Sequence, residues 1–162
     1  MADGPEIRFY HLQTRSLEQT LPVLLRRCLE REMRAVVRAS DKAAVERLAD
    51  HLWTYDDRSF LPHGSDQDGH AGLQPIWITS TGENPNGGRV LFLLDPIEEE
   101  TPGYGDYELV CLLFDGRQES TLTAARDRWK ALLDGGHRLT YWQQDGSGRW
   151  EKKHETGGVA TA

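Results

Sequence analysis

The chain has 162 residues, the size of one ordinary domain, and a formal net charge of -7 at pH 7. This acidic balance argues against an extended nucleic-acid surface, because duplex binding requires a basic footprint. No apolar run is long enough for a membrane span, and the polar N-terminus does not match a signal peptide. We therefore expect a cytoplasmic protein in which Cys28 and Cys111 are buried, reduced thiols.

Short apolar runs and helical stripes alternate along the chain. The expected strands are, in order, Ile7–Leu12, Arg34–Ala39, Pro75–Thr79, Arg89–Leu94, Tyr107–Phe114 and His137–Trp142. The expected helices are Ser16–Met33, Lys42–Trp53 after the cap Ser40-Asp41, and a last helix that runs from Leu122 and is ended by Gly135-Gly136. This alternation predicts right-handed crossovers and an α/β fold with a mostly parallel sheet.

Three details of this fold are expected from local chemistry. Ser16 and Gln19 have the spacing of a capping box, and Pro22 is tolerated only near a helix start, so the regular helix is expected to begin at Pro22. The turn 84–88 is too short for a crossover helix, so the strands on either side are expected to form a hairpin. Residues 1–150 are expected to form a single domain and residues 151–162 a flexible tail.

Nucleotide chemistry is not indicated by the glycine pattern. The segment after the first strand, Gln13–Ser16, contains no glycine, and neither Gly-x-Gly-x-x-Gly nor Gly-x-x-x-x-Gly-Lys-Ser/Thr occurs in the chain. Without glycines the backbone cannot approach a pyrophosphate closely. We therefore expect no phosphate-binding loop and no cofactor.

Catalytic and metal-binding patterns are also weak. A cluster of possible ligands consists of His63, Asp66, Asp68 and His70, but the spacing meets neither a zinc nor a calcium pattern, so a solvated polar loop is expected. Glu98–Glu100 is interpreted as a solvated charge run, and no nucleophile elbow or carboxylate pair occurs. The expectation is a non-catalytic protein without a metal site. The alternative is an α/β enzyme of unknown reaction that uses the loop from His63 to His70.

Two aromatic segments remain as candidate binding sites. The last helix carries one apolar stripe, expected to be Leu122, Ala125, Trp129, Leu132 and Leu133. Arg126 and Lys130 flank Trp129, so this helix face suits a ligand with an apolar end and a negative end, unless Trp129 is simply a core residue. Trp53 and Phe60 present the same choice between closing the core and binding a partner.

These segments together resemble the chi subunit family of the bacterial DNA polymerase III holoenzyme. The matching residues are Arg8-Phe9-Tyr10, Leu52-Trp53, Ser59–His63, Pro75–Ile78 and Arg126–Lys130, which cover roughly residues 7–142. The resemblance departs at Leu122, where the family has a basic residue, and at Trp129, where it often has Tyr. The acidic segment Ile97–Gly105 has no match.

The resemblance implies a Rossmann-like three-layer sandwich without a phosphate loop. It also implies a non-catalytic accessory subunit in DNA replication that binds the acidic C-terminal tail of single-stranded-DNA-binding protein. A psi subunit then links it to the clamp loader, DNA is contacted only indirectly, and the chain alone is a monomer. By position, the residues that bind the tail peptide are Trp53, Phe60, Arg126, Trp129 and Lys130.

Overall fold

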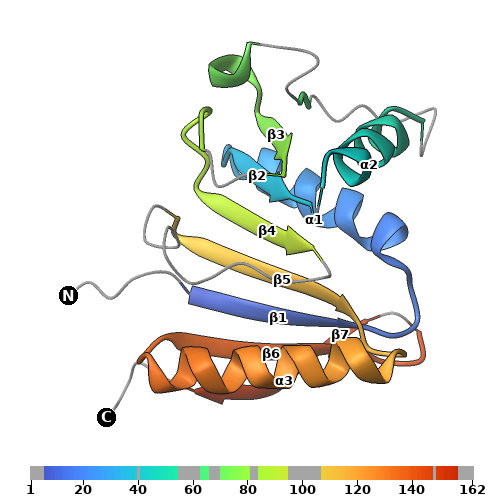
Figure 1. Cartoon of the computed structure of the whole chain (residues 1–162), viewed down its shortest axis with the longest axis vertical. Coiled ribbons are helices and arrows are strands. Elements are labelled where there is room, and N and C mark those ends of the chain that lie inside the picture. The colour runs from blue at the N-terminus through green and yellow to red at the C-terminus, as the bar shows by residue number, and fades with distance from the viewer. Residues whose placement is uncertain are drawn as a thin grey trace.

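A single seven-stranded sheet organises the molecule (Figure 1). The structure, a computed structural model, describes residues 6–39, 41–54, 63–65, 70–80, 84–94, 107–147 and 149–156. Its strands are β1 (Glu6–Leu12), β2 (Ala35–Arg38), β3 (Ile76–Thr79), β4 (Val90–Leu94), β5 (Leu109–Asp115), β6 (Arg138–Gln144) and β7 (Trp150–Thr156). They lie in the order β3-β2-β4-β5-β1-β6-β7, and every neighbouring pair is parallel except β6 and β7.

Helices cover the sheet on both sides and complete a Rossmann-like, three-layer α/β sandwich. They are α1 (Leu17–Glu30), α2 (Lys42–Thr54) and α3 (Glu119–Asp134), with a short 3-10 turn, η1, at Ala71–Leu73. The path from β1 through β2 to β3 moves toward one edge, whereas β5 to β6 moves toward the other. Right-handed crossovers therefore place α1 and α2 on one face and α3 on the opposite face, as Figure 1 shows.

Most residues of β2, β3, β4 and β5 are apolar on both faces, as expected for a parallel sheet covered by two layers of helices. β2, β3 and β4 are buried at every residue, and β5 is buried from Val110 to Phe114. β5 lies between β4 and β1, at the centre of the sheet. The two hydrophobic cores are separated by the sheet, one under α1 and α2 and the other under α3.

The first helix begins earlier than expected. Ser16 caps it and forms the full capping box with Gln19, so the helix starts at Leu17 and continues through Pro22. A proline inside a helix leaves the carbonyl four residues earlier without its usual partner. Here that carbonyl belongs to Glu18, and Nε2 of His51 on α2 donates a hydrogen bond to it at 2.7 Å. This tertiary contact explains why the expected start at Pro22 was wrong.

The expected hairpin between the third and fourth strands was also wrong. β3 and β4 are both parallel to β2 and lie on either side of it, with Ile76 and Val90 both level with Ala35. The strands are only four and five residues long, so the connecting segment is long enough to return along the sheet without a crossover helix. The length of the loop before β4 therefore did not decide whether β4 runs parallel or antiparallel to β3.

The sheet gains a strand where a flexible tail was expected. β7 pairs antiparallel with β6, from Gln144 opposite Trp150 to Leu139 opposite Thr156. The Asp145 carboxylate stabilises the intervening turn by accepting hydrogen bonds from the backbone N–H groups of Ser147 and Arg149. A charged strand such as β7 suits an exposed sheet edge, because charged side chains discourage pairing with other chains. Residues 157–162 of the expected tail lie outside the described residues.

Both cysteines are free and buried, as expected from the sequence. Burial raises the pKa of Cys28 to about 11 and also raises the pKa of Cys111. Neither thiol is therefore activated as a nucleophile at neutral pH. Among the residues that the structure describes, no helix is long and apolar enough to span a membrane.

Candidate functional site

Helix α3 carries the clearest candidate site, a surface that we call the α3 patch: Arg126, Trp129 and Lys130. The helix packs on β5 and β6 through the buried side chains of Ala125 and Leu132. Gly136 adopts a positive φ of 84° directly after the helix, as the Gly135-Gly136 pair predicted. Residues three and four apart share a helix face, which places the three side chains of the patch together at the edge of the buried stripe.

One member of the expected stripe is corrected by the structure. Leu133 is 39% exposed, whereas its neighbour Leu132 is fully buried. Successive residues are about 100° apart around a helix, so both cannot face the same layer of the sheet. Leu122 and Trp129 are partly buried and pack against the core beneath α3, as predicted.

Trp129 belongs both to the core and to the surface. Its ring contacts Phe9 of β1 edge to face, with centroids 5.2 Å apart, and Tyr141 of β6 in a similar arrangement at 5.8 Å. His154 of β7 lies 6.5 Å away. Because the Trp129 side chain stays only half-buried, part of the indole remains available to a ligand while the rest is held by neighbouring rings.

Arg126 supplies the charge beside this aromatic cluster. Its side chain is exposed and makes no hydrogen bond or ion pair with any other described residue. Burial first, and then the nearby Arg126 charge, lower the pKa of His11. Burial raises the pKa of Tyr141, and Arg126 opposes that increase. The Tyr141 hydroxyl and Nδ1 of His11 share a hydrogen bond of 2.7 Å, so the cation lies beside an ordered pair of polar rings.

The patch has the chemistry of an anion-plus-ring binding surface. A guanidinium can bind a carboxylate through two parallel hydrogen bonds, and Lys130, also exposed, adds a point charge one turn away. Trp129 offers an apolar surface for a side chain next to that carboxylate. Arg126 does not form an internal ion pair within the described residues, so a ligand has no such pair to break.

Of the five predicted residues, the structure describes the side chains of Arg126, Trp129 and Lys130, which share one face of α3. Trp53 is near the end of α2, which packs toward β3 at one edge of the sheet, whereas α3 packs on β5 and β6 on the opposite face (Figure 1). Strands are about 4.8 Å apart, so several strand widths and the thickness of the sheet separate the two helices. The Trp53 side chain and all of Phe60 lie outside the described residues.

The turn between β1 and α1 confirms the absence of a phosphate loop and shows what replaces it. The carboxamide oxygen of Gln144 accepts hydrogen bonds from the backbone N–H groups of Gln13, Thr14 and Arg15, at 2.9, 3.0 and 3.1 Å. In nucleotide-binding folds, the N–H groups at this position bind phosphate. Here a buried glutamine side chain occupies them.

The alternative enzyme site in the loop after α2 gains no support from its described members. His63 is 3% exposed, and its Nε2 donates to the carbonyl oxygen of Ala49 at 3.0 Å. His70 is exposed, and Asp66 and Asp68 lie outside the described residues. Within the part of the chain that the structure covers, no group of three potential metal ligands occurs. His63 therefore has a structural explanation, as a histidine that joins the loop to α2.

Four residues around the patch were missed from the sequence: Phe9, His11, Tyr141 and His154. Their signal was the period of two in a strand, since Phe9 and His11 lie two residues apart and share one face of β1. The alternation of residues along β1 does not predict which helix covers that face of the strand. Only the order of the strands places Tyr141 and His154 beside Trp129.

Fold and turn together define a class: a Rossmann-like α/β domain in which a glutamine side chain occupies the turn that binds phosphate in nucleotide-binding folds. A family described as "DNA polymerase III chi subunit, HolC" matches residues 5–140. The chain belongs to this family, whose members are non-catalytic subunits of the DNA polymerase III complex. The resemblance stated from the sequence is thereby confirmed.

A relative from Rickettsia prowazekii (strain Madrid E) agrees with this assignment. It is named "Probable DNA polymerase III subunit chi" and is 31% identical to this chain over 93 residues. The matched region is 57% of this chain and 56% of the relative. The chain therefore spans little more than half the length of that relative.

Proposed function

We propose that this chain is a non-catalytic accessory subunit of the cytoplasmic DNA polymerase III holoenzyme, and that its α3 patch binds the acidic C-terminal tail of single-stranded-DNA-binding protein. A psi subunit then links the chain to the clamp loader, and DNA is reached only through these partners. The observation that carries the proposal is the exposed Arg126, without an ion pair among the described residues, beside the half-buried Trp129.

The chemistry of the tail complements the patch. According to the resemblance, the tail ends in phenylalanine with a free carboxylate and contains proline and acidic residues. Arg126 pairs with the carboxylate, Trp129 packs against the terminal ring, and Lys130 attracts the preceding acidic residues. A protein of net charge -7 can bind such a tail because the interaction depends on local cations rather than on the overall charge.

The part of Trp53 and Phe60 in tail binding rests on the family resemblance alone. α2 and α3 lie on opposite faces of the sheet, and the Trp53 side chain and Phe60 lie outside the described residues. Their role in tail binding stays a prediction of the resemblance. Comparing Trp53→Ala with Arg126→Ala in the same titration tests this prediction: loss of the peptide in both variants would support a role of Trp53, and loss in Arg126→Ala alone would restrict the site to α3.

The decisive experiment uses the whole chain and the cognate single-stranded-DNA-binding protein, with and without its last residues. We expect binding that weakens strongly with salt, because exposed charges are screened over about 10 Å at 0.1 M salt. A synthetic tail peptide is expected to bind, and the same peptide without its terminal phenylalanine is not. Equal binding of the two peptides would contradict the proposed site.

A further inference from the structure

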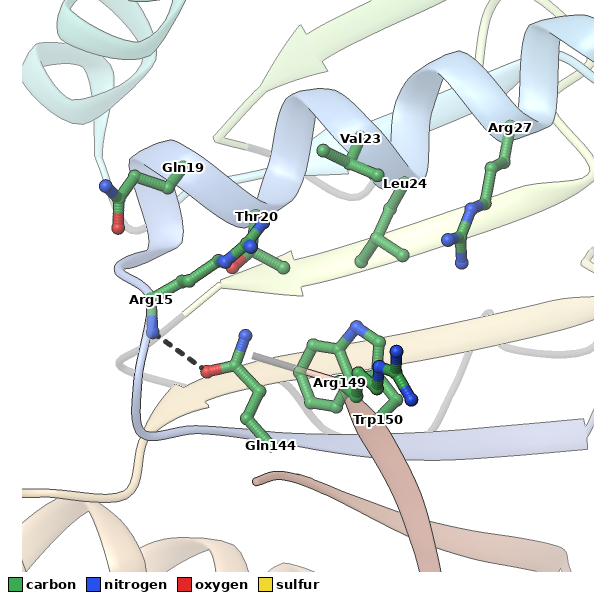
Figure 2. A pocket seen from close by; sticks show the side chains of 9 residues that line it. All are labelled: Arg15, Gln19, Thr20, Val23, Leu24, Arg27, Gln144, Arg149 and Trp150. Atoms are coloured by element: carbon green, nitrogen blue, oxygen red, sulfur yellow. Dashed lines mark hydrogen bonds between the residues drawn. The ribbon is translucent and has the colours of Figure 1, made fainter. Parts of the chain in front are cut away.

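A second basic surface lies on the other face of the sheet, between α1 and the β6–β7 hairpin (Figure 2). It is a pocket of about 460 Å³, within the range of small-molecule sites. The residues on which the argument depends, and which define what we call the α1–β7 pocket, are Arg15, Thr20, Arg27, Gln144, Arg149 and Trp150. They come from the turn after β1, from α1, and from the two strands at the sheet edge.

The arginines of this pocket form no ion pair within the described part of the chain, although Asp145 lies near Arg149: hydrogen bonding from Ser147 first, and the Arg149 charge last, lower the pKa of that carboxylate. Arg15, Arg27 and Arg149 all line it, and none of these guanidinium groups makes a hydrogen bond or ion pair with another described residue. No aspartate or glutamate is among the lining residues. Three like charges around one cavity repel each other, so an anionic ligand relieves an unfavourable interaction in addition to forming new contacts.

The remaining polar side chains of the pocket are also hydrogen-bond donors. The carboxamide oxygen of Gln144 is occupied by three backbone N–H groups, and that of Gln19 accepts from the backbone N–H of Ser16 at 2.9 Å. The Gln144 amide therefore retains only its NH₂ group for a ligand, and the Gln19 oxygen already accepts one N–H group. Figure 2 shows the Gln144 amide, with its oxygen toward the Arg15 backbone. The donors of the lining are therefore complementary to a ligand rich in acceptor oxygens.

A buried hydroxyl points to the same ligand class. Thr20 is 5% exposed and lines the pocket, yet its Oγ1 has no hydrogen-bond partner among the described residues. An unsatisfied buried hydroxyl is costly and needs an explanation. A ligand oxygen supplies the missing partner if the surrounding side chains shift enough to expose Oγ1, which is shielded from solvent in the ligand-free chain.

One side of the pocket is apolar. Trp150 packs edge to face on Tyr10, with ring centroids 4.9 Å apart, and Leu24 and the exposed Val23 lie along the adjacent turn of α1. A planar group fits against such a surface. The pocket also lies at the carboxyl ends of β1 and β6, near the point where the strand order reverses, which is where open α/β sheets bind ligands.

We propose that the α1–β7 pocket binds a nucleoside phosphate, with the phosphate groups on the three arginines and the base beside Trp150. An acidic peptide fits less well, because each peptide unit brings an N–H donor to a pocket whose polar side chains are mainly donors. The side chains bind the phosphates, since the backbone N–H groups of the β1–α1 turn are taken by Gln144. This inference does not rest on the α3 patch, which is on the opposite face.

Calorimetric titration of the whole chain with ADP at low salt tests the proposal. We expect one ADP per chain and at least tenfold weaker binding of inorganic pyrophosphate, which lacks the ring. A 5′-phosphorylated oligothymidylate compared with its unphosphorylated form distinguishes a free nucleotide from a strand end as the source of the phosphate. Absence of ADP binding, equal affinity for pyrophosphate, or tighter binding of hexaglutamate would overturn the proposal.

Variants localise the binding. The double variant Arg27→Gln, Arg149→Gln is expected to lose about a hundredfold or more in ADP affinity, since hydrogen bonds to charged groups each contribute about tenfold or more. Arg47→Gln, an exposed arginine of α2 outside the pocket, removes one charge and is expected to bind ADP like the parent. Equal loss in both variants would mean a general charge effect and would refute the site.

Thr20→Val provides a readout that does not depend on arginine. The isosteric change removes an unsatisfied buried hydroxyl, so the ligand-free variant is expected to melt at or above the parent temperature. Its ADP affinity is expected to fall about tenfold. Unchanged affinity with a folded protein would show that Thr20 does not face the phosphates and would contradict the proposed geometry.

Discussion

The α3 patch and the α1–β7 pocket are both basic and aromatic surfaces of an acidic protein, but they are built in different ways. The patch comes from one short stretch of α3. The pocket joins α1 and the turn before it to the β6–β7 hairpin, through side-chain contacts between residues about 130 positions apart, such as Thr14 and Gln144. The patch is an open helix face, whereas the pocket is a cavity of about 460 Å³.

This difference teaches how each surface selects a ligand. On an open helix face, Arg126 and Lys130 are screened by solvent and salt, so specificity must come from combining a charge with the ring of Trp129. In the pocket, Gln144 and Thr20 are nearly fully buried, so an unsatisfied ligand atom costs more there than on the surface. We therefore expect the patch to tolerate variation in its peptide and the pocket to discriminate more sharply.

The largest expected effect is that of Trp129→Ala. Its loss removes contacts with Phe9 and Tyr141, so the free energy of unfolding is expected to fall by about 2–4 kcal/mol through the cavity left behind. Affinity for the tail peptide is expected to fall as well, while ADP binding stays. Urea unfolding and peptide titration measure the two losses. The matched control is Leu133→Ala, on the same helix but exposed, which is expected to change neither.

If Trp129→Ala loses stability but keeps full affinity for the peptide, Trp129 is a plain core residue. The α3 patch then consists of its charges alone. In that case the α3 patch and the α1–β7 pocket would no longer share the combination of cations with an aromatic ring that contacts the ligand.

The next effect is that of Arg126→Ala. The side chain is exposed and makes no ion pair within the described residues, so the melting temperature is expected to stay near that of the parent. Peptide affinity is expected to fall by about 1.5–3 kcal/mol, the range for a hydrogen bond to a charged group, which corresponds to roughly ten- to a hundredfold. Arg47→Ala on α2 controls for net charge. A folded Arg126→Ala that binds the tail like the parent would show that the patch is misplaced.

Lys130→Ala is expected to have a smaller effect on the peptide. An exposed point charge contributes about 0–1 kcal/mol, so peptide affinity should change by less than about fivefold, and most of that change should disappear at high salt. Titration at two salt concentrations checks this. An effect larger than that of Arg126→Ala would mean that the lysine, not the arginine, holds the terminal carboxylate.

The smallest expected effect is a pH dependence from His11. Burial and the Arg126 charge lower its pKa below the ordinary value of 6.5, so the unfolded chain binds the proton first as the pH falls. The stability that neutral His11 contributes is therefore fully present above pH 6.5 and decreases as the pH falls through that value. Below the folded-state pKa of His11, stability no longer changes with pH through this group. The free energy of unfolding, measured from about pH 5 to 8, is expected to depend less on pH in His11→Asn than in the parent. Arg126→Ala is expected to weaken the pH dependence as well, by a smaller amount. Identical profiles for parent and His11→Asn would contradict this linkage.

Much of the fold follows from local sequence patterns. The apolar strands, the Ser16–Gln19 capping box and the glycine end of α3 were all predicted, because each depends on residues close together in the chain. The patch side chains of α3 were predicted for the same reason, since a spacing of three or four residues is enough to place them together. The missing phosphate loop was likewise readable from the absence of glycine after the first strand.

What failed depended on partners distant in sequence. The hairpin was wrong because β2 separates β3 from β4, and the late helix start was wrong because His51 satisfies the carbonyl of Glu18. β7 was missed because its charged residues resemble a tail until β6 provides a strand to pair with. In each case, the deciding hydrogen bonds join different elements of the fold.

The sequence by itself thus determined the type of fold, the family resemblance and the composition of the α3 patch. The tertiary structure decided that α2 lies on the opposite face of the sheet from α3, and that three arginines line the α1–β7 pocket. The physical reason is that helical spacing acts over one or two turns. The meeting of Arg15, Arg27 and Arg149, by contrast, is set by strand order and by a buried Gln144, whose role no local pattern reveals.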